Sequence, residues 1–158
     1  MLYSFDTSVF MDWQARFYPL DVFVSLQTHL EEMIASGAVQ SVELVREELG
    51  AVAPPTVQQW AKGQRGLFVP LDVDLQAAGA SIEAAFPDLA DHRGIHQSAD
   101  AWVIALAHSR GGTVVSQETS AAEKKNAGRK HYIPDACREL GVPCISLMGL
   151  MRQQKWRL

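Results

Sequence analysis

The chain has 158 residues, of which 47% are apolar and 20% are charged, and these proportions are typical of one soluble globular domain. Its formal net charge of -4 argues against binding nucleic acid with the whole surface, but leaves room for an acidic pocket with a basic rim. The longest apolar run, at 101–107, is too short to cross a bilayer, and the first residues lack the features of a secretory signal. We therefore expect a cytoplasmic protein without a membrane anchor.

Residues 1–53 alternate between strand and helix patterns. A short apolar run ends at Asp6, which predicts a buried strand that stops in a polar turn. Apolar side chains then recur at helical spacing until Gly37, and a second helical stripe, which Ser41 could cap, ends at Gly50. The predicted elements are a strand at 2–5, a helix at 21–36, a strand at 38–40 and a helix at 41–49.

Pro54 and Pro55 interrupt this alternation. The segment after them has the pattern of two helices with polar faces, and it carries no catalytic motif. Its predicted elements are helices at 56–62 and 72–86 and a joining loop at 63–70. We interpret residues 54–90 as a helical insertion or cap within a single domain that spans residues 1–158.

The rest of the chain returns to alternating strands and helices. Ser98 is a candidate N-cap for a helix that is apolar on nearly all sides, and such a helix is typically buried. Strands that alternate with helices predict an α/β fold with a mainly parallel sheet covered on both faces. The predicted elements are a polar loop at 87–97, a helix at 98–109, a strand at 113–116, a helix at 134–140, a strand at 142–146 and a closing helix.

Four acidic residues lie where open parallel sheets bind ligands, near the carboxyl ends of strands. Asp6 directly follows the first strand, and Glu118 comes two residues after the strand at 113–116. Asp100 lies in the first turn of the buried helix, and Glu48 flanks the inward stripe of an earlier helix. Each also has an ordinary explanation, as a turn or loop residue, a favourable charge at a helix start or part of a solvated helix face. Taken together, they predict an acidic cluster.

Such a cluster requires a cation, because crowded carboxylates repel one another and raise their own pKa values. Oxygen ligands without histidine or cysteine favour Mg²⁺ or Mn²⁺, which keep water molecules and bridge to substrate phosphate. We therefore expect a site that hydrolyses phosphodiesters, in which one or two cations position the attacking water and stabilise the departing oxygen.

A basic segment follows Glu118 directly, at residues 123–131. Its position beside the acids suggests that it grips phosphate groups, and counterion release would make such binding depend strongly on salt. A solvated surface loop is the alternative. The candidate RNA contacts are Lys124, Lys125, Arg129 and Lys130.

Several stretches of the chain resemble the PIN-domain superfamily, and more narrowly its DUF4411 family of PIN-like proteins, often found in prokaryotic toxin–antitoxin settings. The opening YSFDTSVFMDW is similar to the family's first strand and acidic motif. This resemblance places the first metal-binding acid on Asp6 and a supporting hydroxyl, also a candidate RNA contact, on Ser8. The stretch SVELVREELG resembles the second acidic helix and points to Glu48, with Glu47 as its rival.

The stretch SADAWVIALAHSRGGTVVSQE resembles the family's later helix and strand, and places two further acids on Asp100 and Glu118. The sequence departs from the usual family pattern here, because Ser116 and Glu118 stand where threonine and aspartate are usual. The late stretch KHYIPDACRELGVPCISL is similar to the narrower family and suggests a role for Asp135, which could equally be a first-turn helix residue.

This resemblance implies a Rossmann-like three-layer α/β/α PIN fold and a Mg²⁺- or Mn²⁺-dependent endoribonuclease that acts as the toxin of a toxin–antitoxin pair. It also implies a cognate antitoxin as partner and frequent homodimers. The implied catalytic acids are Asp6, Glu48, Asp100 and Glu118, and the implied metal ligands are Asp6, Asp100, Glu118 and Asp135.

Three other interpretations remain open. A non-catalytic PIN-like module could keep the fold and the RNA surface, and the substituted Glu118 permits this. Asp6 could be the nucleophile of a phosphatase, although Ser8 stands where such enzymes usually have a second aspartate. His92 and His96 have a spacing that could bind zinc on a helix, but Gly94 separates them and no HExxH motif is present. The two cysteines, at positions 137 and 144, lack the spacing of a redox or zinc motif and are expected to be buried free thiols.

Overall fold

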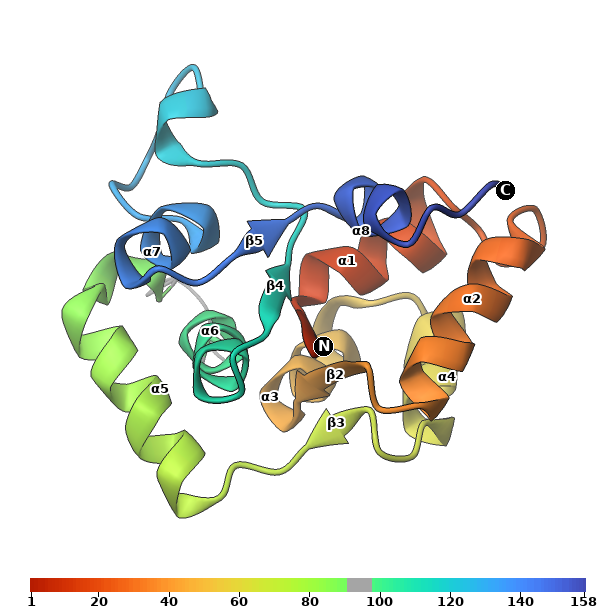
Figure 1. The fold of residues 1–158 in the computed structure, drawn as a ribbon, viewed down its shortest axis with the longest axis horizontal. Coiled ribbons are helices and arrows are strands. Elements are labelled where there is room, and N and C mark those ends of the chain that lie inside the picture. Colours follow the sequence, from red (N-terminus) through yellow and green to blue (C-terminus); the bar gives the residue numbers. More distant parts are fainter. Residues whose placement is uncertain (91–97) are drawn as a thin grey trace.

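The computed structural model describes residues 1–90 and 98–158, and within them five short strands form one parallel sheet. The strands are β1 (Tyr3–Phe5), β2 (Val39–Val42), β3 (Phe68–Val69), β4 (Thr113–Val115) and β5 (Cys144–Ile145). Their order across the sheet is β3-β2-β1-β4-β5, so the first strand of the chain lies at the centre (Figure 1). In the register of this sheet, Tyr3 is paired with Val39 on one side and with Thr113 on the other.

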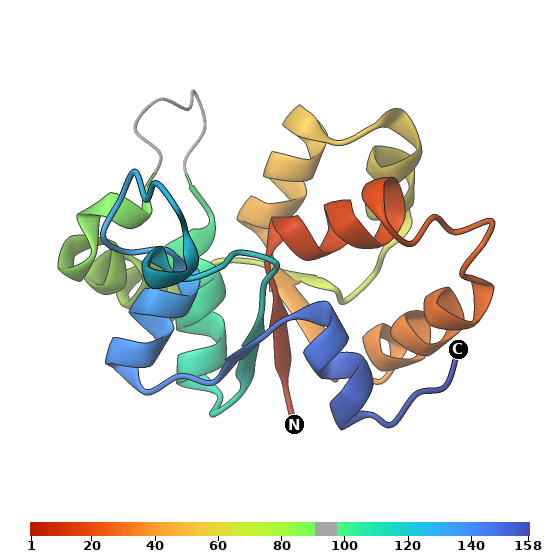
Figure 2. The same cartoon turned by 90° about the horizontal axis from the view of Figure 1, so that it is seen from above.

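Helices cover both faces of the sheet. They are α1 (Thr7–Met11), α2 (Val24–Ala35), α3 (Glu43–Val52), α4 (Pro55–Gly63), α5 (Val73–Ala85), α6 (Asp100–Ser109), α7 (Ile133–Leu140) and α8 (Leu147–Gln153), with a π-helical turn at Asp12–Arg16 and 3-10 turns at Pro87–Leu89 and Ala121–Glu123. Figure 2 shows α5, α6 and α7 on one side of the sheet, and α1 to α4 with α8 on the other. The expected three-layer α/β/α architecture with a parallel sheet is confirmed.

The central helix α6 begins at the predicted acid Asp100 and packs against β1, the strand that Asp6 follows. Its residues 101–107 are all buried, as a helix that is apolar on nearly all sides requires. The Ser4 hydroxyl in β1 donates a hydrogen bond to the backbone oxygen of Val103 at 2.8 Å and so ties this helix to the middle of the sheet. As a result, Asp100 at the start of α6 and Asp6 at the end of β1 belong to two elements that pack directly on each other.

The segment after Asp6 differs from the expected polar turn, because it forms α1 and continues through the π-helical turn. Its buried residues include Val9, Phe10 and Trp13, and the Trp13 ring packs edge-on against Trp60 with centroids 5.2 Å apart. A π-helical turn adds a residue to the helical repeat and so shifts the spacing of the buried side chains. Val9, Phe10 and Trp13 nevertheless stand at helical spacing, but α1 has only five residues, and so short a helix gives no extended periodic pattern in the sequence.

The segment 54–90, expected to be a helical insertion, also supplies an edge strand of the sheet. The loop expected at 63–70 contains β3, in which Phe68 is paired with Ser41 of β2. A strand of two residues is too short to show an alternating pattern. Ser41 itself is not the expected helix cap: it lies in β2, its hydroxyl donates to the backbone oxygen of Phe5 at 2.6 Å, and Val42 is the N-cap of α3.

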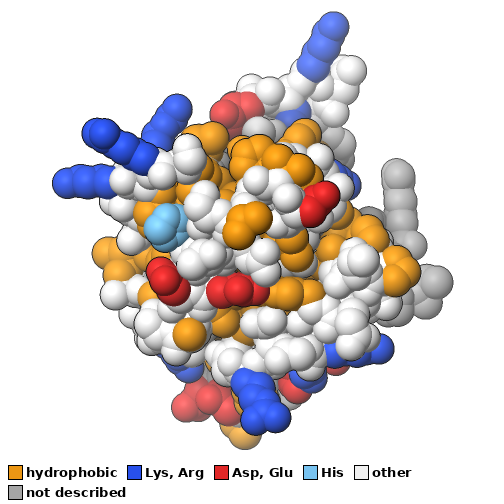
Figure 3. All heavy atoms as spheres, turned by 90° about the vertical axis from the view of Figure 1, so that its right-hand side faces the viewer, with side chains coloured by type: hydrophobic (Ala, Val, Ile, Leu, Met, Phe, Trp, Pro, Cys, Tyr) orange, Lys and Arg blue, Asp and Glu red, His pale blue; other side chains and the backbone are white. Residues whose placement is uncertain are grey.

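One side of the molecule exposes several large apolar side chains. Phe17, Val22 and Val24 lie between the π-helical turn and α2, and they are 62%, 67% and 59% exposed. Figure 3 views the side on which α2 and the C-terminus lie, and apolar side chains gather there among polar ones. Neighbouring exposed apolar groups of this kind are typical of surfaces that contact other proteins.

Candidate active site

The connections of the sheet change direction between β1 and β4, and the carboxyl ends of open α/β sheets offer a crevice at such a topological switch point. From β1 the chain moves outward to β2 and β3 through helices on one face, and it then returns to β4 through α5 and α6 on the opposite face. The connections on either side of this switch point therefore diverge, and ligands of open α/β sheets bind in such crevices. Asp6 follows β1 here, and Ser116 and Glu118 follow β4.

Asp6 is buried and held by hydroxyl groups. Its Oδ2 accepts hydrogen bonds from the hydroxyls of Ser8 at 2.6 Å and Ser116 at 3.2 Å. Burial raises the pKa of the Asp6 carboxyl above its usual value, while the hydrogen bonds from Ser8, from the Thr7 backbone and from Ser116 act in the opposite direction. These hydrogen bonds thus fix the side chain in place.

Asp100 carries the largest unfavourable charge interactions of the cluster. Burial and then the negative charges of Asp6, Glu118 and Glu48 raise the pKa of its carboxyl well above the usual value, against a smaller opposite effect of Arg129. Asp6, Glu48 and Glu118 thus all lie close enough to Asp100 for their charges to act on it, and we call these four residues the acidic cluster. Within residues 1–90 and 98–158, no group donates a hydrogen bond to the Asp100 carboxylate, in contrast to the donors that hold Asp6, Glu48 and Glu118.

Glu48 links three elements at the start of α6. One of its oxygens accepts a hydrogen bond from the Thr7 hydroxyl of α1, and the other accepts one from the backbone N–H of Ala99 at 2.8 Å. A carboxylate in this position satisfies a backbone N–H that has no partner within the helix. Glu47 instead lies exposed on a shallow groove between α3 and α4. The structure thus places Glu48, and not its rival, in the acidic cluster.

Glu118 lies between the cluster and the basic segment. Its Oε2 accepts a hydrogen bond from the backbone N–H of Ile133 at the start of α7, at 3.0 Å. Its Oε1 is 3.9 Å from an Arg129 nitrogen. Burial and the charge of Asp6 raise the pKa of the Glu118 carboxyl, although the Ile133 N–H and nearby cations oppose this. The longer glutamate side chain therefore still reaches the cluster.

Asp135, which we expected as a metal ligand, has a structural position instead. Its Oδ2 accepts hydrogen bonds from the backbone N–H groups of Tyr132 and Ala121, both at 2.9 Å, and its Oδ1 lies 3.2 Å from Arg138. Burial acts to raise its pKa, but these donors hold the pKa of the Asp135 carboxyl below its usual value. Because the carboxylate already caps α7 and fixes the preceding loop, we leave it out of the proposed site.

The carboxylate oxygens of the four acids are suitable ligands for a hard cation, but the side chains as they stand are not arranged around one. Their donors are carboxylate oxygens, whose mutual repulsion a divalent cation would relieve. In residues 1–90 and 98–158, however, no three His, Cys, Asp or Glu side chains are close enough to hold a metal ion as they stand. A cation held by the four clustered acids alone would require their side chains to move closer together.

Two cations of the basic segment, Lys124 and Arg129, make contacts within the protein. The Lys124 ammonium lies over the Tyr132 ring, 4.3 Å from its centroid, and the Arg129 guanidinium also lies over this ring, 4.5 Å from the centroid. Arg129 also donates to the backbone oxygens of Asp88 and Leu89, at 3.1 and 3.0 Å. Among the predicted RNA contacts, these two cations and Ser8 thus have internal partners. The other two, Lys125 and Lys130, are exposed.

His131 connects this segment to the rest of the protein. Its Nδ1 lies 2.9 Å from Asp88, and its Nε2 lies 3.2 Å from Glu139. The hydrogen bond to Asp88 raises the pKa of His131 most strongly, burial opposes it, and Glu139 raises it further. A protonated ring can donate to both carboxylates at once.

This arrangement predicts a pH-dependent stability. Because the folded-state pKa of His131 is raised, its stabilising contribution is fully present below the unfolded-state pKa of about 6.5 and is lost as pH rises through the folded-state pKa. Urea denaturation from about pH 6 to about pH 9 should therefore show His131→Gln to be less stable than the parent at the acidic end, with a smaller difference at the basic end. His108→Gln, on an exposed residue of α6, is the control. A constant difference for His131→Gln would contradict the prediction.

Sequence reasoning missed the groups that hold the acids. Thr7 and Gln117 were not singled out, and Ser116 was noted only as a departure from a pattern, although hydroxyl and amide side chains next to a candidate ligand are a usable signal. The two candidate zinc ligands, His92 and His96, lie outside the described residues. Both cysteines are free thiols, with Cys137 buried and the other half-buried.

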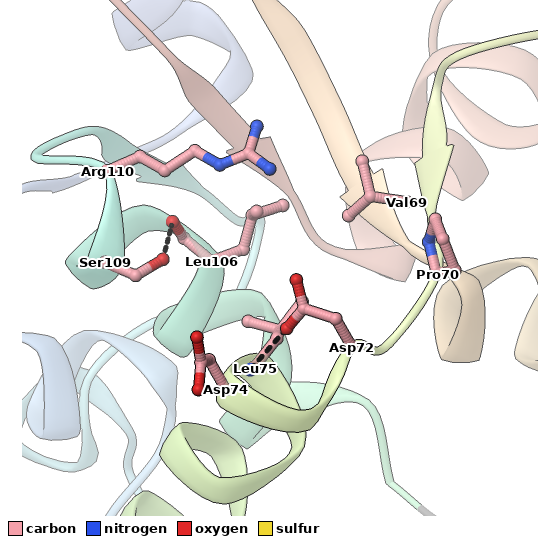
Figure 4. Close-up of a pocket in the computed structure, with 8 residues that line it drawn as sticks. All are labelled: Val69, Pro70, Asp72, Asp74, Leu75, Leu106, Ser109 and Arg110. Carbon is pink, nitrogen blue, oxygen red and sulfur yellow. Dashed lines mark hydrogen bonds between the residues drawn. The ribbon is translucent and has the colours of Figure 1, made fainter.

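A separate pocket of about 130 Å³ lies at the opposite end of α6 (Figure 4). Asp72, Asp74 and Arg110 are among its lining residues. The Asp72 side chain is already engaged, because it caps α5 by accepting from the Leu75 N–H at 2.8 Å. None of the four clustered acids lines this pocket, so its shape gives no reason to place the chemistry there.

Comparisons with known proteins agree with this architecture. Residues 3–158 match the family model described as "Domain of unknown function (DUF4411)", which confirms the resemblance seen in the sequence. A solved structure, that of FitAcB from Neisseria gonorrhoeae, aligns with a TM-score of 0.50 and 16% identity, covering 91% of this chain and 96% of that chain. At this identity the likeness concerns the fold alone, and it agrees with the three-layer α/β/α architecture. No curated protein matches. In the described residues, no helix is both long and apolar enough to span a membrane.

Proposed function

The chain belongs to the DUF4411 family, and from the acids that its fold brings together we propose that it is a metal-dependent endoribonuclease. The observation that carries this proposal is that Asp6, Glu48 and Glu118 lie close enough to Asp100, at the switch point of the sheet, for their negative charges to raise the pKa of its carboxyl. Four carboxylates that lie close together repel one another, and a bound cation would relieve that repulsion. The adjacent basic segment fits a polyanionic substrate.

In this proposal the acids divide into two kinds. Asp6, Glu48 and Glu118 are held by fixed donors and would form the rigid side of a Mg²⁺ or Mn²⁺ site, while Asp100 would complete it. A bound cation would supply charge stabilisation and lower the pKa of a coordinated water molecule. The exposed Lys125 and Lys130 would bind phosphate groups of the strand.

Cleavage assays with purified protein and single-stranded RNA test this proposal. We expect cleavage in Mg²⁺ or Mn²⁺, none after chelation by EDTA, and a loss of about 100-fold or more in Asp6→Asn. Asp21→Asn, a change in an exposed loop, is the control for the lost charge. Cleavage that persists in Asp6→Asn would rule out this site. RNA binding with no cleavage in any metal would favour the non-catalytic module, and release of phosphate from small phosphomonoesters would favour a phosphatase.

The proposed RNA surface predicts a specific salt dependence. A single-stranded nucleic acid loses roughly 0.7 of a counterion for each phosphate contact, so removal of two contacts should reduce the slope of log Kd against log salt by about 1.4. We expect this change for the double variant Lys125→Gln/Lys130→Gln, measured by RNA binding in EDTA. Lys62→Gln/Lys155→Gln, which removes two exposed lysines elsewhere, should leave the slope unchanged. Equal slopes for all three proteins would exclude these lysines as contacts.

We propose further that the nuclease is the toxin of a toxin–antitoxin pair. The exposed apolar side chains at Phe17, Val22 and Val24 support a protein partner, either the antitoxin or a second copy of the chain. Growth arrest on expression, relieved by Asp6→Asn, would support the toxin role. Normal growth at the same expression level would contradict it.

A further inference from the structure

Gln117 joins three separate parts of the structure beside the acidic cluster. Its side-chain oxygen accepts a hydrogen bond from the backbone N–H of Leu147, the first residue of α8, at 2.8 Å. Its side-chain nitrogen donates to Oδ2 of Asp12, a buried acid in the π-helical turn, at 3.1 Å. Its backbone N–H donates to the Ser8 hydroxyl at 3.0 Å. All the hydrogen-bonding groups of its amide side chain thus face other elements.

The backbone bonds in this turn fix the direction of two hydroxyl protons. The Ser8 oxygen accepts the Gln117 N–H, and the Ser116 oxygen accepts the Glu118 N–H at 3.1 Å. A hydroxyl has a single proton, so a hydroxyl that accepts a backbone N–H still has that proton to donate. Both protons are directed to the same atom, Oδ2 of Asp6.

We propose that Gln117 is the positioning residue of the acidic cluster: it clamps the turn after β4 onto α8 and the π-helical turn, so that two oriented hydroxyls hold Asp6 and the following residue, Glu118, reaches the same crevice. This inference deepens the proposed function and rests on it for its link to catalysis. The side-chain hydrogen bonds of Gln117 go to Leu147 and Asp12 and not to the four clustered acids. Gln117 therefore acts through the backbone of residues 116–118, which orients the Ser8 and Ser116 hydroxyls.

The first test is metal binding by Gln117→Ala. Removal of groups that orient metal ligands typically weakens metal affinity about 10-fold to 100-fold, and we expect a Mn²⁺ dissociation constant raised by at least 10-fold. Gln58→Ala is the matched control, because it removes another half-buried amide whose nitrogen donates to a backbone oxygen, that of Ala53, at 2.8 Å. A Mn²⁺ affinity within twofold of the parent in Gln117→Ala would overturn the proposal.

A charge-conserving exchange separates positioning from loss of stability. Gln117→Glu alone should weaken Mn²⁺ binding, because it removes the donor to Asp12 and sets two carboxylates against each other. Adding Asp12→Asn restores a donor and an acceptor in reversed order at the same net charge as the parent. We expect the double variant to regain most of the affinity, whereas additive losses would contradict a direct Gln117–Asp12 contact.

Amide hydrogen exchange tests the inference without any metal. We expect the Glu118 amide to exchange at least about 10-fold faster in Gln117→Ala, because the turn that aligns it with Ser116 is released. Unchanged exchange at Glu118 would overturn the positioning role. If the parent protein neither binds Mn²⁺ nor cleaves RNA, the proposed function fails, and the exchange measurement still decides whether Gln117 holds the turn.

Discussion

Asp100→Asn is expected to raise the melting temperature of the metal-free protein while abolishing metal-dependent cleavage. The pKa of the Asp100 carboxyl is raised by burial and by three neighbouring acids, so its ionised form destabilises the folded state at neutral pH. Asparagine has nearly the same shape without the charge. We expect a rise of about 2–6 °C at pH 7.5 in EDTA, and a loss of cleavage of about 100-fold or more.

The pH dependence of this effect has a defined sign. A carboxyl whose pKa is higher in the folded state than in the unfolded state lowers stability as pH rises above the unfolded-state value of about 3.9. The advantage of Asp100→Asn should therefore be absent near about pH 4 and grow as pH rises through the folded-state pKa of Asp100. Thermal unfolding across this range measures it.

Asp74→Asn is the matched control for this variant, because Asp74 occupies the first turn of α5 as Asp100 occupies that of α6. Loss of a favourable charge at a helix start should lower the melting temperature slightly or leave it unchanged, and cleavage should persist. A lower melting temperature in Asp100→Asn would show that the carboxylate is stabilised by contacts that outweigh the repulsion.

Gly79→Ala should destabilise the protein by about 1–3 kcal/mol, although alanine is the better helix former. Gly79 lies in α5 where this helix packs on α6, and a Cβ atom added there would lie 2.2 Å from the indole nitrogen of Trp102. The Trp102 ring is buried, so it cannot move aside without displacing its neighbours. Helix propensity would favour alanine by only about 1 kcal/mol, and the steric overlap should outweigh it.

Urea denaturation of Gly79→Ala and Gly50→Ala separates these two effects. Gly50 lies inside α3 with no atom within 4 Å of an added Cβ, so alanine there should be neutral or stabilising. Both variants gain the same helix propensity, and only the first meets Trp102. Similar free energies of unfolding for the two variants would mean that α5 and α6 can separate at little cost.

The sequence predicts those members of the candidate site that lie next to the end of a strand or helix. Asp6, Asp100 and Glu118 stand next to the ends of elements whose periodicity is visible along the chain, and a parallel sheet brings such ends together. The choice between Glu47 and Glu48 could not be made in this way. It depends on the rotation of α3, which places the Glu48 carboxylate on the Ala99 N–H, 51 positions along the chain.

The roles of the charged groups around the site were also decided by distant contacts. Asp135 has the sequence context of a candidate ligand, yet its carboxylate is taken up by the loop and helix start that it joins. Arg129 has the context of an RNA contact, yet it binds the backbone oxygens of Asp88 and Leu89. A free charge and a charge with an internal partner have the same sequence signature.

By itself, the sequence of this protein determined the alternation of strands and helices, the buried central helix α6 and the acids placed at element ends. These features depend on periodicity and on residues within a few positions of one another. Only the tertiary structure decided that α1 and β3 exist, which acids converge, and that Ser8 and Ser116 direct their protons to Asp6. The physical reason is that burial, side-chain direction and hydrogen-bond partners depend on packing between residues far apart in the chain, such as Ser116 and Asp6, which are 110 positions apart.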